Sequence, residues 1–268
     1  MIASLDGWVD AAEAASEAVA HIARTGEVVA SFDPDAIFDY RSRRPVLDVM
    51  DGRLSDLRWP ELSLRHVAVG GRDLLILSGA EPDLRWQELA DDMVELAERL
   101  SVGQWISLGA VPGAVAHTMP VPVMATASED GLLAEGTVGP EGLLRVPAAA
   151  LSAMEMAVSD AGIPAVGFFA QVPPYASIGY AAASIALLGR LGSHLGVELD
   201  DGDLAEEERE QRARYDAAVA GDAMLRQTVE QLESAGEEDD EEERLPSGDE
   251  LAREIERFLR GQGEGGEA

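Results

Sequence analysis

The stretch SVGQWISLGAVPGAVAHTMPVPVMATAS, residues 101–128, decides the fold class of this chain. Residues 105–108 are apolar and partly β-branched, which predicts a short interior strand. The strand is expected to end in a loop that contains Gly109, Pro112 and Gly113. Pro120 and Pro122 then keep the following residues extended. The stretch therefore predicts a buried strand, a loop and a second extended segment.

Similar apolar runs flank this stretch and alternate with segments of helical periodicity. Further strands are predicted at residues 1–5, 27–32, 73–77 and 165–172, with weakly patterned extended chain at 46–69. Helices are predicted at residues 11–23, 84–100, 148–161 and 182–195, where apolar residues recur with a period of 3.6. This alternation predicts a three-layer α/β/α fold with a largely parallel central sheet.

The last quarter of the chain differs from the rest in composition. Residues 198–268 contain 25 of the 51 acidic residues but only 8 of the 20 basic ones. We predict an α/β core domain at residues 1–197 and an acidic helical appendage at 198–268. A long polar helix is expected at 205–234, and an acidic run predicts a flexible linker near 236–245. Ser247 and Glu250 form a capping box that predicts a final short helix.

Composition excludes several classes of function. The formal net charge of −31 makes nucleic-acid binding through phosphate contacts improbable. Cysteine is absent and every basic residue is arginine, which excludes thiolate and Schiff-base chemistry and a P-loop lysine. The four histidines are scattered, so we expect neither a metal nor a cofactor. No apolar run is long enough for a membrane span, and we expect a cytoplasmic protein.

Polar residues follow several of the predicted strands. In open α/β sheets, the loops at the carboxyl ends of the strands form the crevice where ligands bind. The candidate crevice residues are Asp10, Glu81, Arg85, His117 and Thr118. Each residue type also has a structural interpretation: Asp10 and Asp83 are suited to capping the helices that follow them. For His117 we favour a structural role, in which the side chain only holds its loop, since no second His, Cys or acid lies near it in the sequence.

A second candidate surface lies in FDPDAIFDYRSRRP, residues 32–45, where acids and arginines alternate over a short distance. Arginine forks suit carboxylates and phosphates, so this segment could clamp an anionic group or a partner chain. The alternative is an ion-pair network that fixes a loop or lies at a subunit interface, which we favour. The candidate interface residues are Asp39, Tyr40, Arg41, Arg43 and Arg44.

Several blocks of the chain, in order, resemble the family of proteasome assembly chaperone 2-like proteins, particularly its actinobacterial branch. These blocks are DGWVDAAEAA, FDYRSRRP, GAEPDLRW, LGAVPGAVAHTMPVPVMATAS, QVPPY and PSGDELAREIERFL. The resemblance implies a three-layer fold similar to nucleoside phosphorylases and hydrolases, usually without demonstrated catalysis. It also implies a homo-oligomer, with a trimer favoured, and protein partners such as proteasome subunits, because eukaryotic relatives are scaffolds for proteasome α-ring assembly.

The chain departs from the pattern of that family at two of these positions. Met119 stands where relatives commonly have arginine, and Pro174 stands where they often have histidine. A pocket that depended on those polar groups would be weakened here. We therefore expect a non-enzymatic assembly chaperone or interaction scaffold. The alternative is a protein or enzyme that binds a nucleoside or phosphorylated compound in the strand-end crevice.

Overall fold

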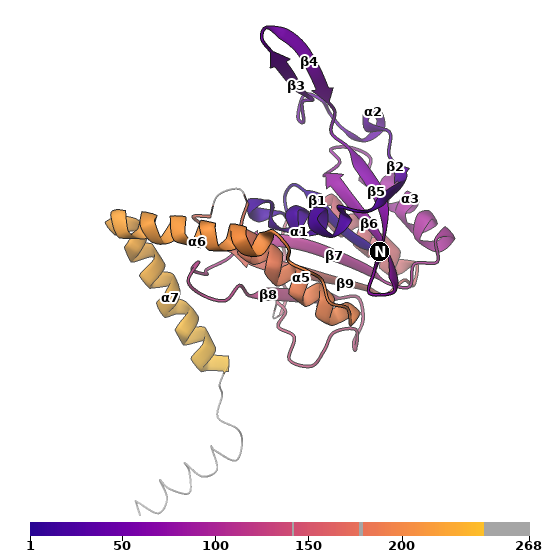
Figure 1. The fold of residues 1–268 in the computed structure, drawn as a ribbon. Helices are drawn as coiled ribbons and strands as arrows, with labels where there is room; N and C mark the ends of the chain where they lie inside the picture. The colour runs from indigo at the N-terminus through magenta and orange to yellow at the C-terminus, as the bar shows by residue number, and fades with distance from the viewer. Residues whose placement is uncertain (141, 177–178, 244–268) are drawn as a thin grey trace, which may run out of the picture.

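A computed structural model describes residues 1–140, 142–176 and 179–243. The described residues form one seven-stranded sheet with the order β2-β5-β6-β1-β7-β9-β8 (Figure 1). The strands are β1 (Ile2–Asp6), β2 (Glu27–Ser31), β5 (Leu62–Val69), β6 (Arg72–Ala80), β7 (Trp105–Pro112), β8 (Val123–Ala127) and β9 (Ala165–Val172).

The direction of the strands divides this sheet into a centre and two flanks. The four central strands, β6, β1, β7 and β9, run parallel to one another. The outer strands β5, β2 and β8 join antiparallel to their neighbours. The antiparallel pair β5–β6 closes through Gly70 and Gly71, both at positive φ, as a two-residue hairpin requires. The predicted largely parallel α/β sheet is thus confirmed, with mixed flanks.

Helices cover both faces of the sheet, which completes the three layers. The 3₁₀ turn η1 (Ala11–Glu13), α1 (Ala14–Ala23) and α5 (Ala181–Leu195) lie on one face, and α3 (Trp86–Arg99) and α4 (Ala150–Asp160) on the other. Successive strand residues point to opposite faces. In β7, Ile106 therefore packs beneath α1 and α5, whereas its neighbour Trp105 packs beneath α3 and α4.

A two-stranded hairpin stands clear of the main sheet (Figure 1). It follows the short helix α2 (Pro34–Ile37) and consists of β3 (Val46–Met50) and β4 (Arg53–Arg58), which form a separate sheet. Asp51 and Gly52 connect the strands, both with positive φ, which suits an Asp-Gly hairpin turn. The weak apolar pattern of residues 46–69 thus covers two different structures: this hairpin and the buried strand β5.

The predicted helix at 205–234 is two helices, α6 (Leu204–Gly221) and α7 (Ala223–Glu243). Asp222 separates them in an extended conformation, and its carboxylate accepts the backbone N–H groups of Met224 and Leu225. The side chain thereby caps α7, which explains the break.

The helix α6 packs against α5 in the core. The side chain of Gln211 is buried there and accepts the backbone N–H of Ala181 at 2.9 Å. The division of the chain at residue 197 remains a prediction. Residues 236–243 of the predicted linker lie in α7, while its end and the helix expected after Ser247 lie outside the described residues. No helix in the described ranges has both the length and the apolar character to cross a membrane.

Candidate functional site

His117 lies in the loop after β7 and is buried. Its Nδ1 lies 2.7 Å from the hydroxyl of Tyr175, and its backbone N–H donates to the same hydroxyl at 2.8 Å. On the other side of the ring, Nε2 lies 3.3 Å from Oδ1 of Asp216 in α6. A ring proton on Nε2 satisfies all of these contacts, because the hydroxyl then donates to Nδ1 while it accepts the backbone N–H.

The neighbouring residue Thr118 joins the same loop to α7. Its hydroxyl donates to Oε1 of Glu233 at 2.5 Å. The ring of Tyr215, from α6, lies 5.4 Å from the His117 ring, measured between centroids. Helices α6 and α7 therefore both hold the loop that follows β7, through side chains that contact His117 and Thr118.

The order Asp216, His117, Tyr175 resembles the acid–base–nucleophile arrangement of hydrolases. The electrostatics oppose that function, however. Burial raises the pKa of the Tyr175 hydroxyl, whereas a nucleophilic phenolate needs a lowered pKa. The same hydroxyl also accepts a backbone N–H, which occupies a lone pair. The arrangement therefore serves to hold the loop.

A cavity of about 640 Å³ lies beside His117 and Thr118. Its apolar wall comes from α5 and includes Ile185, and its polar rim combines Arg209 and Arg212 with the acids Asp201 and Glu208. The volume falls within the range of small-molecule sites. This cavity is where the structure brings two of the five candidate crevice residues together.

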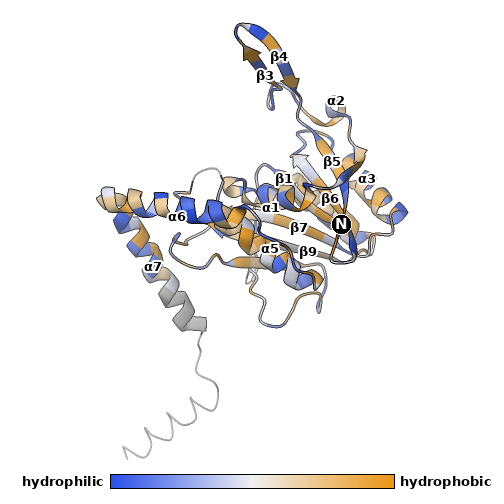
Figure 2. Ribbon diagram, viewed as in Figure 1, coloured by the Kyte–Doolittle hydropathy of each residue, from blue (hydrophilic) through white to orange (hydrophobic). Residues whose placement is uncertain are grey.

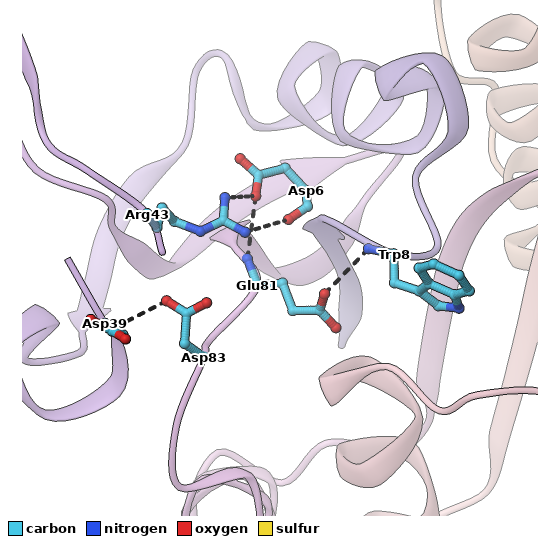
Figure 3. A network of polar contacts seen from close by, with 6 residues as sticks. All are labelled: Asp6, Trp8, Asp39, Arg43, Glu81 and Asp83. Atoms are coloured by element: carbon cyan, nitrogen blue, oxygen red, sulfur yellow. Dashed lines mark hydrogen bonds and ion pairs between the residues drawn. The ribbon is translucent and has the colours of Figure 1, made fainter. Parts of the chain in front are cut away.

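Glu81 follows β6, and its carboxylate contacts the backbone of Trp8 (Figure 3). Its Oε2 accepts the backbone N–H of Trp8 at 3.2 Å, and its Oε1 accepts the backbone N–H of Ala150 at 2.8 Å. Ala150 is the first residue of α4, so the carboxylate satisfies a donor that the helix leaves unpaired. Glu81 thus connects the ends of β1 and β6 to the start of α4.

The candidate interface segment is fastened to the same end of the sheet (Figure 3). Nη1 of Arg43 donates to Oδ1 of Asp6 at 2.7 Å, and the carboxylate of Asp83 accepts the backbone N–H of Asp39 at 3.0 Å. The capping role expected for Asp83 is therefore wrong: the residue before α3 is Arg85, at φ 60°, and Asp83 binds the segment at residue 39 instead.

The other members of this segment are Tyr40, which is half-buried, and Arg41 and Arg44. Tyr40 donates to Asp35 at 2.5 Å, and this hydrogen bond raises the pKa of Tyr40 to about 12. The Tyr40 ring also packs edge-on against Trp59, with 4.7 Å between centroids. Arg41 and Arg44 are exposed at the base of the hairpin. The segment therefore combines internal fastenings with arginines that face solvent.

Arg85 and Asp10 lie apart from the His117 cavity. Arg85 pairs with Glu88 at the start of α3 and lines a separate cavity of about 170 Å³. Asp10 is buried, and its Oδ1 accepts the backbone N–H groups of Ala15 and Ser16 in the first turn of α1. Burial raises the pKa of Asp10, and Oδ2 has no hydrogen-bond partner among the described residues.

The two side-chain partners of His117 were not predicted from the sequence. Tyr175 and Asp216 lie 58 and 99 residues away along the chain, so no local motif connects them. The rigid Pro173–Pro174 loop before Tyr175 was the only available signal. Within the described ranges, His, Asp and Glu side chains form no cluster of three or more that could hold a metal ion.

Comparison with known proteins places this geometry in a family. The model of the PAC2 family matches residues 4–219. A PAC2 family protein from Streptomyces avermitilis has a TM-score of 0.74 and 35% identity, with 81% of this chain and 94% of that chain covered. No match was found among curated proteins.

Two solved structures from Mycobacterium tuberculosis are also similar. A proteasome-assembly chaperone homologue has a TM-score of 0.77 and 32% identity, covering 85% of this chain and 98% of that chain. A protein of unknown function has a TM-score of 0.84 and 35% identity, with 91% of this chain and 84% of that chain covered. The family match over most of the chain and these likenesses agree with the resemblance found in the sequence: the chain belongs to the PAC2 family.

Proposed function

We propose that the chain is a non-enzymatic assembly chaperone or interaction scaffold that forms a homo-oligomer, a trimer by family resemblance, and binds proteasome subunits in the cytoplasm. Membership of the PAC2 family supports a chaperone-like role. The similarity to the mycobacterial proteasome-assembly chaperone homologue extends over nearly the whole of that protein.

One observation about the strand ends carries the proposal. The polar side chains there hold the protein's own segments together. Glu81 accepts two backbone N–H groups. His117 contacts Tyr175 and α6, and Thr118 donates a hydrogen bond to α7. Groups with these commitments position loops and helices rigidly, as a scaffold requires, and they are not arranged around a reacting atom.

An assembly assay with purified proteasome subunits from the host tests this proposal. We expect a substoichiometric amount of the full chain to increase the rate at which complete particles form. The matched control is bovine serum albumin, which is also acidic and corrects for non-specific effects of an added protein. An unchanged rate, together with no binding of the separate subunits, would contradict the proposal.

The cavity beside His117 supports a second candidate function, which is binding of a nucleoside or phosphorylated compound. Arg209 and Arg212 could contact an anionic group there, and the apolar wall from α5 could contact a base. Asp10, Glu81 and Arg85 lie outside the lining of this cavity, so the candidate crevice reduces here to His117 and Thr118.

Thermal stabilisation by a panel of nucleosides, nucleotides and inorganic phosphate tests this second function. A ligand at a hundred times its Kd stabilises the folded chain by about 2.7 kcal/mol. The control is the double variant Arg209→Gln and Arg212→Gln, which keeps the exposed positions polar. A true cavity ligand stabilises the wild-type chain and stabilises the variant less. No shift with any compound would exclude these ligand classes.

A further inference from the structure

The hairpin β3–β4, residues 46–58, has one face that is entirely apolar; we call this hairpin the arm. Leu47 pairs directly with Leu57, and Val49 pairs with Leu54. The register shifts between these two pairs, which accommodates one extra residue in β4. The shift brings Leu54 and Leu57 to the same face although they are three positions apart. Figure 2 shows hydrophobic stretches on both strands of the arm.

The opposite face of the arm carries paired charges together with the exposed apolar side chains of Val46 and Met50. Arg58 makes two contacts with Asp48, at 2.6 and 3.0 Å, and a third with Asp56 at 3.4 Å. These contacts align the two strands and leave the apolar face without any charge. The four apolar side chains are exposed to solvent by 47% (Leu47), 58% (Val49), 76% (Leu54) and 46% (Leu57).

An uncovered hairpin of this kind is unusual for a protein that functions as a monomer. A two-stranded hairpin is marginally stable in water unless it packs on something else. Contiguous exposed apolar faces on soluble proteins commonly mark interaction sites. The arm therefore needs a covering surface, and its charge indicates which one.

The arm and its base form a basic segment in an acidic chain. Residues 41–58 contain five arginines against three aspartates, a net charge of +2, whereas the whole chain carries −31. Arg44 and Arg53 are exposed at the two ends of this segment, one at the base and one beside the turn. The arm is thus complementary in charge to the body of its own protein, and less so to a basic partner.

A groove between α3 and α4 has the matching chemistry. It has a volume of about 550 Å³, and Val94, Ala157 and Ala161 contribute small apolar side chains to it. Its acidic lining residues are Asp91, Glu95, Glu98 and Asp160. An apolar strip bordered by carboxylates is what a surface with an apolar face and arginine ends would contact.

We propose that the arm of one copy docks in the α3–α4 groove of a second copy. The apolar face of the arm covers the apolar strip, and Arg44 and Arg53 contact the acidic rim. Because the arm and the groove are different surfaces, the contact is heterologous and propagates head to tail until a ring closes. This proposal rests on the homo-oligomer of the proposed function and names the surfaces that form it. It does not depend on whether the chain also binds proteasome subunits.

The test measures the mass of the purified full chain in solution by light scattering. The wild-type chain is expected at a multiple of its 28.4 kDa monomer mass. In the arm variant, Leu54→Asp places a charge on the apolar face, and in the groove variant, Asp91→Arg with Glu98→Arg reverses the rim. Each variant alone is expected to lose the oligomer and to have the monomer mass, with a wild-type circular dichroism spectrum.

Matched controls separate the interface from general surface effects. Leu143→Asp changes an apolar residue that is 83% exposed, close to the 76% of Leu54. Glu129→Arg with Asp130→Arg reverses two exposed acids next to β8, at the edge of the sheet opposite the arm. Both controls are expected to keep the wild-type mass. Loss of the oligomer in either control would overturn the assignment of the interface.

Mixing the two variants gives the sharpest outcome. The arm variant keeps an intact groove and the groove variant keeps an intact arm, so an equimolar mixture is expected to form a pair of about twice the monomer mass. A mixture that stays monomeric overturns the proposal. A groove variant that keeps its oligomer also overturns the proposal, because it would indicate contact between two arms. A monomeric wild-type chain overturns it as well, because the arm would then bind a different protein.

Discussion

Removing one hydroxyl, in Tyr175→Phe, tests whether the His117 loop is a structural fastening. The Tyr175 hydroxyl is bonded to both the backbone N–H and Nδ1 of His117, and His117 is only 5% exposed. A buried polar group that loses its partner costs roughly 1–3 kcal/mol. Tyr175 itself is only half-buried, so water can reach part of the gap, and we expect a loss of about 2 kcal/mol in unfolding free energy.

The assay is thermal unfolding of the full chain, followed by circular dichroism. For a chain of this size, a loss of about 2 kcal/mol lowers Tm by about 4 °C. The matched control is Tyr40→Phe, which removes a hydroxyl that is bonded to exposed Asp35 and should change Tm far less. Equal, small shifts in both variants would refute the claim that Tyr175 holds the loop.

Three further predictions concern other parts of the fold. Gln211→Ala removes the acceptor for the backbone N–H of Ala181 and should lower the free energy of unfolding by about 1–3 kcal/mol. If α6 belongs to the core, hydrogen exchange should also become faster throughout that helix. Gly79 has φ 136°, and a Cβ there would lie 2.1 Å from the Glu61 carbonyl oxygen. Gly79→Ala should therefore abolish soluble expression or lower Tm strongly, whereas Gly103→Ala, which meets nothing within 4 Å, should not. Burial raises the pKa of Asp10 in the folded chain above its ordinary value of 3.8. As pH rises, Asp10 therefore loses its proton in the unfolded chain before it does so in the folded chain. The free energy of unfolding of the wild-type chain should fall relative to that of Asp10→Asn as pH rises from 3.8 towards neutral. Urea titrations across that range measure the difference, and a difference that stays constant with pH would contradict the assigned burial.

The sequence was most informative where burial determines the pattern. The strand at residues 165–172 has the predicted bounds. Its residues are buried or half-buried on both faces of the sheet, so they form one continuous apolar run whose ends are easy to locate in the sequence. The strand predicted at 73–77 extends over Arg72–Ala80, since its ends are more polar than its centre. Helix α3, predicted at 84–100, covers Trp86–Arg99, because Arg85 has a left-handed backbone at φ 60° and Leu100 leaves the helical conformation.

Long-range contacts account for most of what the sequence did not predict. Asp83 has the chemistry of a helix cap, yet it binds the backbone of Asp39, 44 residues away. The break at Asp222 was missed because the helical periodicity continues across it, while the capping carboxylate acts within three residues. The hairpin at 46–58 was obscured because the register shift in β4 interrupts the simple alternation of apolar and polar residues.

The candidate site shows the same limit. His117 and Thr118 were selected because they follow a buried strand, and the structure places both beside one cavity. Glu81, Arg85 and Asp10 satisfy the same sequence criterion but lie in separate local networks. A position at a strand end therefore predicts a place at the edge of the sheet. It does not predict which strand ends share a site.

The central claim, that this PAC2-family chain engages proteasome subunits, is tested most directly by quantitative affinity purification from the native host. The tagged full-length chain serves as bait at low and high salt, and an untagged lysate is the background control. The account predicts selective enrichment of proteasome subunits over equally abundant cytoplasmic proteins at both salt concentrations. Enrichment of the chain alone, with no proteasome subunit above background, would contradict it and direct attention to a ligand for the His117 cavity.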